Sequence, residues 1–319
     1  MKVMLTQDWD EKYSQKIEAE FEDIEIVKAL EEDEQQKVME EAEIVIGFPG
    51  DLDAGILAEG PALKWVQALS AGVDKLLEQS EAEWMAENGV MLTNMSGLHR
   101  DIIAEHTMAF ILSFSRRLPE LYEQQKNKEW NRISLSGLKG KKLLVIGLGN
   151  IGQGIVEVAN AFGMIVDGVK RNPDEGVPGV EKIYGQDQLQ EAFAGVDYAV
   201  SILPLTPETE GMIGAAEFKA MPETARFINV GRGPVVNQDE LLAALEFGEI
   251  AGAGLDVFEE EPLPPESPFY KLDNVIITPH VAGSFSGYYE RATDMFIENI
   301  RLYQAGKEMK RLVNYEAGY

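Results

Sequence analysis

The stretch K-K-L-L-V-I-G-L-G-N-I-G, residues 141–152, decides the fold class of this chain. Its apolar residues predict a short buried strand, and glycines 147, 149 and 152 follow that strand in the spacing G-x-G-x-x-G. The next segment, 151–162, predicts a helix. In this context the first glycine permits a tight turn, the second lets a phosphate approach the backbone, and the third lets helix and strand pack closely. The stretch therefore predicts a dinucleotide pyrophosphate held at a helix N-terminus.

The residues around this stretch predict open parallel sheets. Apolar runs alternate with helical segments from residue 142 onward, which fits a doubly wound domain of the Rossmann type. These strand candidates cover 142–146, 165–169, 199–203, 225–230, 253–257 and 275–278. A similar alternation precedes them, with strands at 3–5, 24–27, 44–46 and 65–68 and helices at 13–21 and 34–41. We therefore expect two α/β domains, each a doubly wound parallel sheet.

Two longer helical segments set the expected domain boundaries. The segment 101–123 is apolar over most of its length and predicts one buried helix that links the domains. The amphipathic segment 288–303 follows the last strand and could return the chain to the first domain. We expect a discontinuous first domain of residues 1–98 and 285–319, and a second domain of residues 99–284.

Composition limits the classes of function. The chain has 319 residues, 45% of them hydrophobic, with 28 basic and 55 acidic residues and a net charge of −27. This charge argues against nonspecific binding to nucleic acid or to an anionic membrane. The absence of cysteine excludes disulfides and thiolate metal sites, and we expect no metal. The N-terminus becomes acidic too soon for a signal peptide, and the apolar runs are shorter than the ~20 residues of a membrane span, so a cytoplasmic protein is expected.

The residues after the second strand of the dinucleotide domain predict the cofactor. In the NAD-binding version of this fold an Asp or Glu ends that strand and accepts a hydrogen bond from the ribose 2′-hydroxyl. Here the strand is followed by Lys170, Arg171 and Asn172. Cationic side chains can pair with a 2′-phosphate, so we predict that NADP(H) is preferred and NAD(H) is possible. The alternative is that both cations are solvated and the preference is set elsewhere.

Three further segments carry side chains suited to catalysis at the ends of predicted strands. They are N-V-G-R-G at 229–233, D-V-F-E-E-E-P at 256–262 and T-P-H-V-A-G at 278–283. An imidazole titrates near neutral pH and can give a proton to a carbonyl oxygen that receives a hydride. A carboxylate bonded to the far ring nitrogen orients the ring and favours its protonated form. An arginine fork suits a substrate carboxylate.

Together with S-A-G-V-D at 70–74 and L-P-L-T-P-E-T at 203–209, these motifs resemble the D-isomer-specific 2-hydroxyacid dehydrogenases over nearly the whole chain. The resemblance implies a Rossmann-type cofactor domain and a flavodoxin-like substrate domain. It also implies an oxidoreductase that reduces 2-keto acids to D-2-hydroxy acids by hydride transfer from NADPH. A homodimer paired through the cofactor domains is implied as well.

The family's catalytic trio falls on Arg232, Glu261 and His280. Glu261 is chosen among three neighbouring acids because it lies five residues after Asp256 and directly before a proline. His280 would donate the proton, Glu261 would orient it, and Arg232 would bind the substrate carboxylate. That carboxylate would also meet the backbone of the turn at Ser70, Ala71 and Gly72. The cofactor residues implied are Gly147, Gly149, Asn150, Ile151, Gly152, Lys170, Arg171, Asn172, Pro204, Thr209, Val230 and Asp256.

Some alternatives stay open at this point. A dinucleotide-sensing binding protein of the corepressor type would use the same fold. Among enzymes, Glu261 argues against formate dehydrogenase, which has Gln in that place, but glyoxylate, hydroxypyruvate, pyruvate and branched-chain keto acids all remain possible substrates. The roles of His99, Arg100, Tyr288 and Tyr289 are also open.

Overall fold

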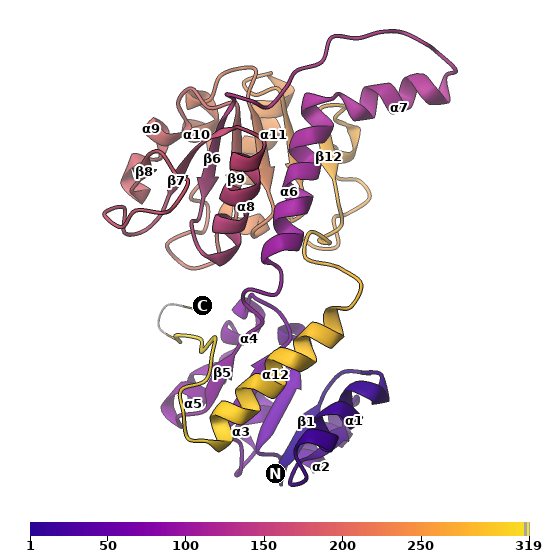
Figure 1. Cartoon of the computed structure of the whole chain (residues 1–319), viewed down its shortest axis with the longest axis vertical. Coiled ribbons are helices and arrows are strands. Elements are labelled where there is room, and N and C mark those ends of the chain that lie inside the picture. The colour runs from indigo at the N-terminus through magenta and orange to yellow at the C-terminus, as the bar shows by residue number, and fades with distance from the viewer. Residues whose placement is uncertain (316–317, 319) are drawn as a thin grey trace. The chain divides into compact units, whose positions relative to one another are not determined.

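The computed structural model describes residues 1–315 and 318, and it divides the chain into two compact units (Figure 1). Unit 1 comprises Met1–Leu98 and Phe285–Tyr319, and unit 2 comprises His99–Ser284. Residues 316, 317 and 319, which belong to the expected range 285–319, lie outside the described residues. Both units are α/β with wholly parallel sheets, which confirms the predicted fold class.

The strands are β1 Lys2–Leu5, β2 Glu25–Lys28, β3 Ile44–Gly47, β4 Trp65–Ala68, β5 Met91–Thr93, β6 Lys142–Ile146, β7 Ile165–Val169, β8 Ile183–Tyr184, β9 Tyr198–Ser201, β10 Arg226–Asn229, β11 Gly252–Leu255 and β12 Val275–Ile277. The helices are α1 Glu11–Glu20, α2 Glu32–Met39, α3 Ala54–Ala58, α4 Asp74–Leu77, α5 Ala82–Glu87, α6 Arg100–Ser115, α7 Leu118–Lys126, α8 Asn150–Ala161, α9 Leu189–Phe193, α10 Ala215–Ala220, α11 Gln238–Glu246 and α12 Tyr288–Gln304. Within the described residues, no helix is long and apolar enough to span a membrane.

Unit 1 is built on a sheet with the strand order β2-β1-β3-β4-β5, the flavodoxin-like order. Its strands alternate their side chains between two buried layers, because helices cover both faces. On one face α12 contributes Ala292, Phe296 and Ile300 to the core that also holds Ile17 of α1. Figure 1 shows α12 crossing the sheet. The other face is covered by α2, α3 and α5.

The first residues of α12 belong to an aromatic cluster inside unit 1. The Tyr288 ring stacks on Phe48 at 6.2 Å between centroids, and the Tyr289 ring meets Trp9 edge-on at 5.8 Å. The Tyr288 hydroxyl also donates to the backbone oxygen of Leu69. Both tyrosines, whose roles the sequence left open, therefore pack against other residues of unit 1.

Unit 2 is built on a sheet with the order β12-β11-β10-β9-β6-β7-β8. Counted from β6, this is the Rossmann order, and the strand order reverses between β6 and β9. One face is covered by α6 and α8, and the other by α9, α10 and α11. Ligands of such sheets bind beyond the carboxyl ends of the strands at this reversal, where the loop 147–149 lies.

The structure places a strand at every run that the sequence predicted, and it adds two. The added strands are β5 and the two-residue β8. The prediction of one buried helix over 101–123 was wrong. The chain leaves α6 after Ser115, Arg117 adopts a left-handed φ of 52°, and α7 begins at Leu118 with proline in its first turn. Residues of α7 are exposed or half-buried, so this second helix covers little of its own unit.

Candidate active site

The loop after β6 has the backbone that its glycines predict. Gly147 adopts a φ of +107°, a conformation that side chains disfavour. A Cβ on Gly152 would lie 1.9 Å from the backbone oxygen of Gly147, so only glycine lets α8 start this close to the strand. Gly149 precedes the first residue of α8, and a Cβ there would meet nothing within 4 Å. The space above Gly149 can therefore admit a ligand.

This loop fits the pyrophosphate of a dinucleotide. Asn150, Ile151 and Gly152 form the first turn of α8, where backbone amides have no partner inside the helix. The helix dipole adds a partial positive charge at the same end. The sequence-predicted phosphate residues therefore come together around one helix N-terminus.

Two acids of the protein interact with the cations that follow β7. The Lys170 ammonium donates to Glu175 Oε2 at 3.1 Å and to the Glu175 backbone oxygen at 3.3 Å. The pKa of Glu208 is lowered, chiefly by a hydrogen bond from the Thr206 hydroxyl and in part by the positive Arg171. Asn172 is exposed beside them. The sequence did not reveal Glu175, because its approach depends on the course of the loop.

The loop after β9 is closed by Thr209. Its hydroxyl donates to the backbone oxygen of Pro204 at 2.7 Å and accepts from the Thr206 amide at 2.8 Å. Thr209 is buried, so its hydroxyl shapes the loop from within. Pro204 and Thr209, two of the cofactor residues that the resemblance implies, therefore lie in one hydrogen-bonded turn.

Arg232 follows β10 on a turn that Asn229 holds. The Asn229 side chain accepts from the Gly231 amide at 3.1 Å and donates to the Arg232 backbone oxygen at 3.0 Å. The guanidinium of Arg232 donates to the Gly231 oxygen at 3.0 Å. Val230 is buried in the same turn. Asn229 is a supporting residue that the motif contained but the sequence reasoning did not single out.

His280 and Glu261 form a hydrogen-bonded pair. His280 Nδ1 lies 2.6 Å from Glu261 Oε2, and Glu261 Oε1 accepts from the Phe258 amide at 3.0 Å. Both carboxylate oxygens are thus engaged, which fixes the orientation of the acid. The imidazole is half exposed, and with Nδ1 engaged its Nε2 is the nitrogen available to a ligand. The neighbouring Glu259 instead accepts from the Gln238 amide.

Asp256 holds the turn that carries His280. Its carboxylate is 1% exposed and accepts from the Thr278 hydroxyl at 2.5 Å and from the amides of Val281 and Ala282 at 2.9 Å each. The His280 amide donates to the Asp256 backbone oxygen at 2.8 Å. This network supports His280 at its left-handed φ of 52°. The resemblance implies that Asp256 binds the cofactor, and the structure shows that its carboxylate also holds this turn.

The other two histidines flank this network from unit 2. His106 Nε2 lies 3.1 Å from the Thr278 hydroxyl, so α6 also contacts the network that holds the turn of His280. His99 Nδ1 lies 3.1 Å from the Gly283 oxygen. Burial lowers the pKa of His99, and the positive charge of Arg232 lowers it further, while the Gly283 carbonyl acts in the opposite direction. Arg100 pairs with Glu157 of α8 at 2.8 Å.

The predicted carboxylate-binding turn lies in unit 1, after β4. The Ser70 hydroxyl donates to the Gly72 oxygen at 2.5 Å, and the Asn94 side chain donates to the Ala71 oxygen at 2.9 Å. The backbone oxygens of Ala71 and Gly72 therefore accept hydrogen bonds from side chains of the protein itself. Asn94 is a second supporting residue that the sequence reasoning missed.

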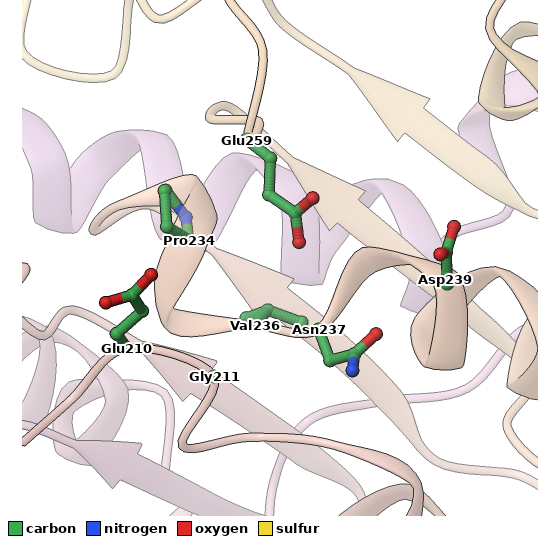
Figure 2. Close-up of a pocket in the computed structure, with 7 residues that line it drawn as sticks. All are labelled: Glu210, Gly211, Pro234, Val236, Asn237, Asp239 and Glu259. Carbon is green, nitrogen blue, oxygen red and sulfur yellow. The ribbon is translucent and has the colours of Figure 1, made fainter.

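A hollow of about 480 Å³ lies in unit 2 and is lined by Glu210, Gly211, Pro234, Val236, Asn237, Asp239 and Glu259 (Figure 2). Three of these residues carry carboxylates. Figure 2 shows the Glu259 carboxylate pointing toward the segment of Val236 and Asn237, while Asp239 sits on the first turn of α11. An anionic keto acid would be repelled there, so the hollow is a poor candidate for the substrate site.

Comparison with known proteins places the chain in a family. A model described as the NAD-binding domain of D-isomer specific 2-hydroxyacid dehydrogenases matches residues 108–282. Glyoxylate reductase of Korarchaeum cryptofilum is 33% identical over 274 residues, covering 83% of this chain and 80% of that protein.

Solved structures agree over the full length. A D-isomer specific 2-hydroxyacid dehydrogenase from Xanthobacter autotrophicus, in complex with NADPH and MES, has a TM-score of 0.86 at 30% identity and covers 100% of this chain and 99% of its own. An NADPH-dependent glyoxylate/hydroxypyruvate reductase from Sinorhizobium meliloti, in complex with NADP and sulfate, has a TM-score of 0.87 at 26% identity with the same coverage. This chain belongs to the D-isomer specific 2-hydroxyacid dehydrogenases and is an NAD(P)-dependent oxidoreductase of that family.

Proposed function

We propose that this protein reduces 2-keto acids to D-2-hydroxy acids, with NADPH as the preferred hydride donor. The observation that carries the proposal is the pair of His280 and Glu261, joined at 2.6 Å at the carboxyl-end edge of the sheet that also carries the glycine loop. Unit 2 is the cofactor domain in this proposal, and unit 1 is the substrate domain. The bound cofactor supplies the hydride that reaches C2 of the keto acid.

His280 supplies the proton in this reaction. Its Nδ1 is held by Glu261, so Nε2 donates to the keto oxygen as charge develops there. Glu261 keeps the ring in one orientation through its hydrogen bond to Nδ1. Arg232 binds the substrate carboxylate and polarises the ketone. We assign the backbone amides of Ala71 and Gly72 to the same carboxylate.

The preference for NADPH rests on the residues after β7. Lys170 and Arg171 stand where an NAD-specific site has an acid, and a 2′-phosphate carries up to two negative charges for them to meet. Two similar solved structures contain NADPH or NADP. NADH lacks the 2′-phosphate but shares every other group, so we expect it to bind more weakly rather than to be excluded.

Small keto acids are the proposed substrates. The names of similar proteins include glyoxylate reductase and glyoxylate/hydroxypyruvate reductase. We therefore place glyoxylate and hydroxypyruvate first among the candidates. We also propose a cytoplasmic site of action, with which the cysteine-free composition is compatible.

Steady-state kinetics with a panel of keto acids test the proposal. We expect loss of NADPH absorbance with glyoxylate or hydroxypyruvate, and a kcat/KM for NADPH at least about tenfold above that for NADH, because charge-assisted bonds to the 2′-phosphate are lost with NADH. Pyruvate and a branched-chain keto acid complete the panel. If no acid is turned over, the proposed reaction is wrong. Faster turnover with NADH at low cofactor concentration would remove the assignment of Lys170 and Arg171.

We further propose that the protein is a homodimer paired through unit 2. Exposed apolar side chains gather on α7 and the stretch that follows it, which Figure 1 shows reaching away from the sheet of their own unit. Trp130 is 95% exposed, and Leu118, Tyr122 and Leu135 are exposed on the same segment. Large aromatic side chains in this position are typical of interface anchors.

Removing the anchors should separate the dimer. The double substitution Tyr122→Ser and Trp130→Ser is expected to raise the dimer dissociation constant at least about 100-fold, since each buried aromatic anchor contributes on the order of 2 kcal/mol. Sedimentation velocity over a dilution series measures this constant. Phe247→Ser is the matched control, because Phe247 is 81% exposed on unit 2 but lies at the end of α11. Equal association of both variants would contradict the proposed surface.

A further inference from the structure

Lys170 is tied to an acid of its own loop. Its ammonium donates both to the Glu175 carboxylate, at 3.1 Å, and to the Glu175 backbone oxygen, at 3.3 Å. The Lys170 side chain is mostly buried, with 20% exposed, whereas the Glu175 side chain is 71% exposed. The protein around it therefore confines the lysine side chain, whereas water can solvate the exposed glutamate carboxylate once the ion pair opens.

The acid lies where a 2′-phosphate would compete with it. In this fold the end of β7 meets the adenosine ribose, and Lys170 is the first residue after that strand. The two bonds to Glu175 take two of the three N–H donors of the ammonium, so a phosphate oxygen that approaches this nitrogen competes with the carboxylate for its charge. A phosphate brings more charge and three acceptor oxygens, so it can displace a single exposed carboxylate.

We propose that Glu175 is a specificity-determining residue that weakens the preference of this protein for NADPH over NADH. The inference rests on the proposed use of Lys170 for the 2′-phosphate. In the free protein Glu175 pairs with the Lys170 ammonium, and a 2′-phosphate that binds there competes with this ion pair. NADH has no group that needs the ammonium, so the ion pair persists when NADH is bound. Specificity is a difference of two affinities, and Glu175 lowers one of them.

The substitution Glu175→Gln should therefore act on one cofactor. We expect the Kd for NADPH to fall about three- to tenfold. The substitution removes both the exposed ion pair that competes for Lys170 and a negative charge near the phosphate, and effects of this kind have that size. The Kd for NADH should change by less than about twofold. Adenosine 2′,5′-bisphosphate should follow NADPH, because it carries the 2′-phosphate without the nicotinamide. Isothermal titration of the full chain measures all three.

The neighbouring Asp174→Asn is the matched control. Asp174 is exposed on the same loop and has the same charge, whereas the Lys170 ammonium donates to Glu175. A general change in electrostatic potential would affect both variants alike, whereas the proposed competition affects Glu175→Gln alone. Introducing Lys170→Gln should abolish the effect of Glu175→Gln, since the two residues act as a pair.

The outcomes separate this inference from the proposed cofactor preference. If the wild-type protein binds NADPH no better than NADH, the cofactor preference fails, and the effect of Glu175→Gln on the ratio of the two Kd values is still decisive for Glu175. If that ratio shifts no more than in Asp174→Asn, Glu175 has no part in selection. A weaker NADH affinity with unchanged NADPH affinity would show instead that Glu175 serves the ribose hydroxyl, which overturns the proposal.

Discussion

Replacing His280 by Gln is expected to lower kcat for keto-acid reduction by about 10²–10⁴-fold and to leave NADPH binding unchanged. Gln can still bond to the Glu261 carboxylate that now lies 2.6 Å from the ring, but it has no proton to give at neutral pH. The hydride would then have to reach a ketone whose oxygen receives its proton from water. Steady-state turnover gives kcat, and quenching or enhancement of NADPH fluorescence gives the cofactor Kd.

The backbone at this position calls for a second variant. His280 has a φ of +52°, and Asn adopts such a conformation more readily than Gln. His280→Asn should therefore fold at least as well as His280→Gln and be equally inactive. Thermal unfolding checks that both variants are intact. A folded variant that keeps more than about a tenth of the wild-type kcat would remove His280 from the role of proton donor.

The partner of His280 has a matched control next to it in the chain. Glu260 is an exposed acid adjacent to Glu261, so Glu260→Gln and Glu261→Gln change the charge by the same amount. Only Glu261 contacts the imidazole among the described bonds of these two acids. We expect Glu261→Gln to lower kcat and Glu260→Gln to leave it unchanged. Equal effects would show that the acidic run acts through its overall charge.

The sequence predicted the parallel sheets well because buried strands in this fold are short, continuous apolar runs. Two strands were missed for physical reasons. β8 has only the residues Ile183 and Tyr184, too few to form a pattern, and β5 is a three-residue strand, Met91–Thr93. The break between α6 and α7 was missed because Arg117 adopts a left-handed conformation, which an arginine does not predict.

The motifs located the candidate site residues, but not what holds them. Glu261 was chosen by its spacing from Asp256, and the structure places that acid against His280. By contrast, the bond from His106 to Thr278 joins residues 172 positions apart, and no local pattern predicts such a contact. The same is true of Glu175, whose carboxylate reaches Lys170 through the course of a loop. Long-range and loop contacts depend on tertiary structure, which a single sequence does not display.

Loss of the Arg232 side chain is also expected to have a large effect, measured as kcat/KM for the keto acid. Arg232→Gln is expected to lower kcat/KM for the keto acid by about 10²–10³-fold, because a charge-assisted pair with the substrate carboxylate is lost and the keto oxygen is no longer polarised. The turn itself should survive, since Asn229 holds it through the Arg232 backbone oxygen and the Gly231 amide. Arg232→Lys keeps the charge but loses the planar fork. Its kcat/KM should therefore lie between that of the wild-type protein and that of Arg232→Gln.

The division of this loss between KM and kcat identifies what Arg232 does. A higher KM alone would mean that the side chain binds substrate and transition state equally, whereas losses in both constants mean that it also stabilises charge on the keto oxygen. We expect losses in both. Arg171→Gln is the control of opposite kind, because it should weaken NADPH and leave the keto-acid KM unchanged. If Arg232→Gln instead reproduces the pattern expected of Arg171→Gln, the arginine serves the cofactor, and the substrate carboxylate must be bound elsewhere.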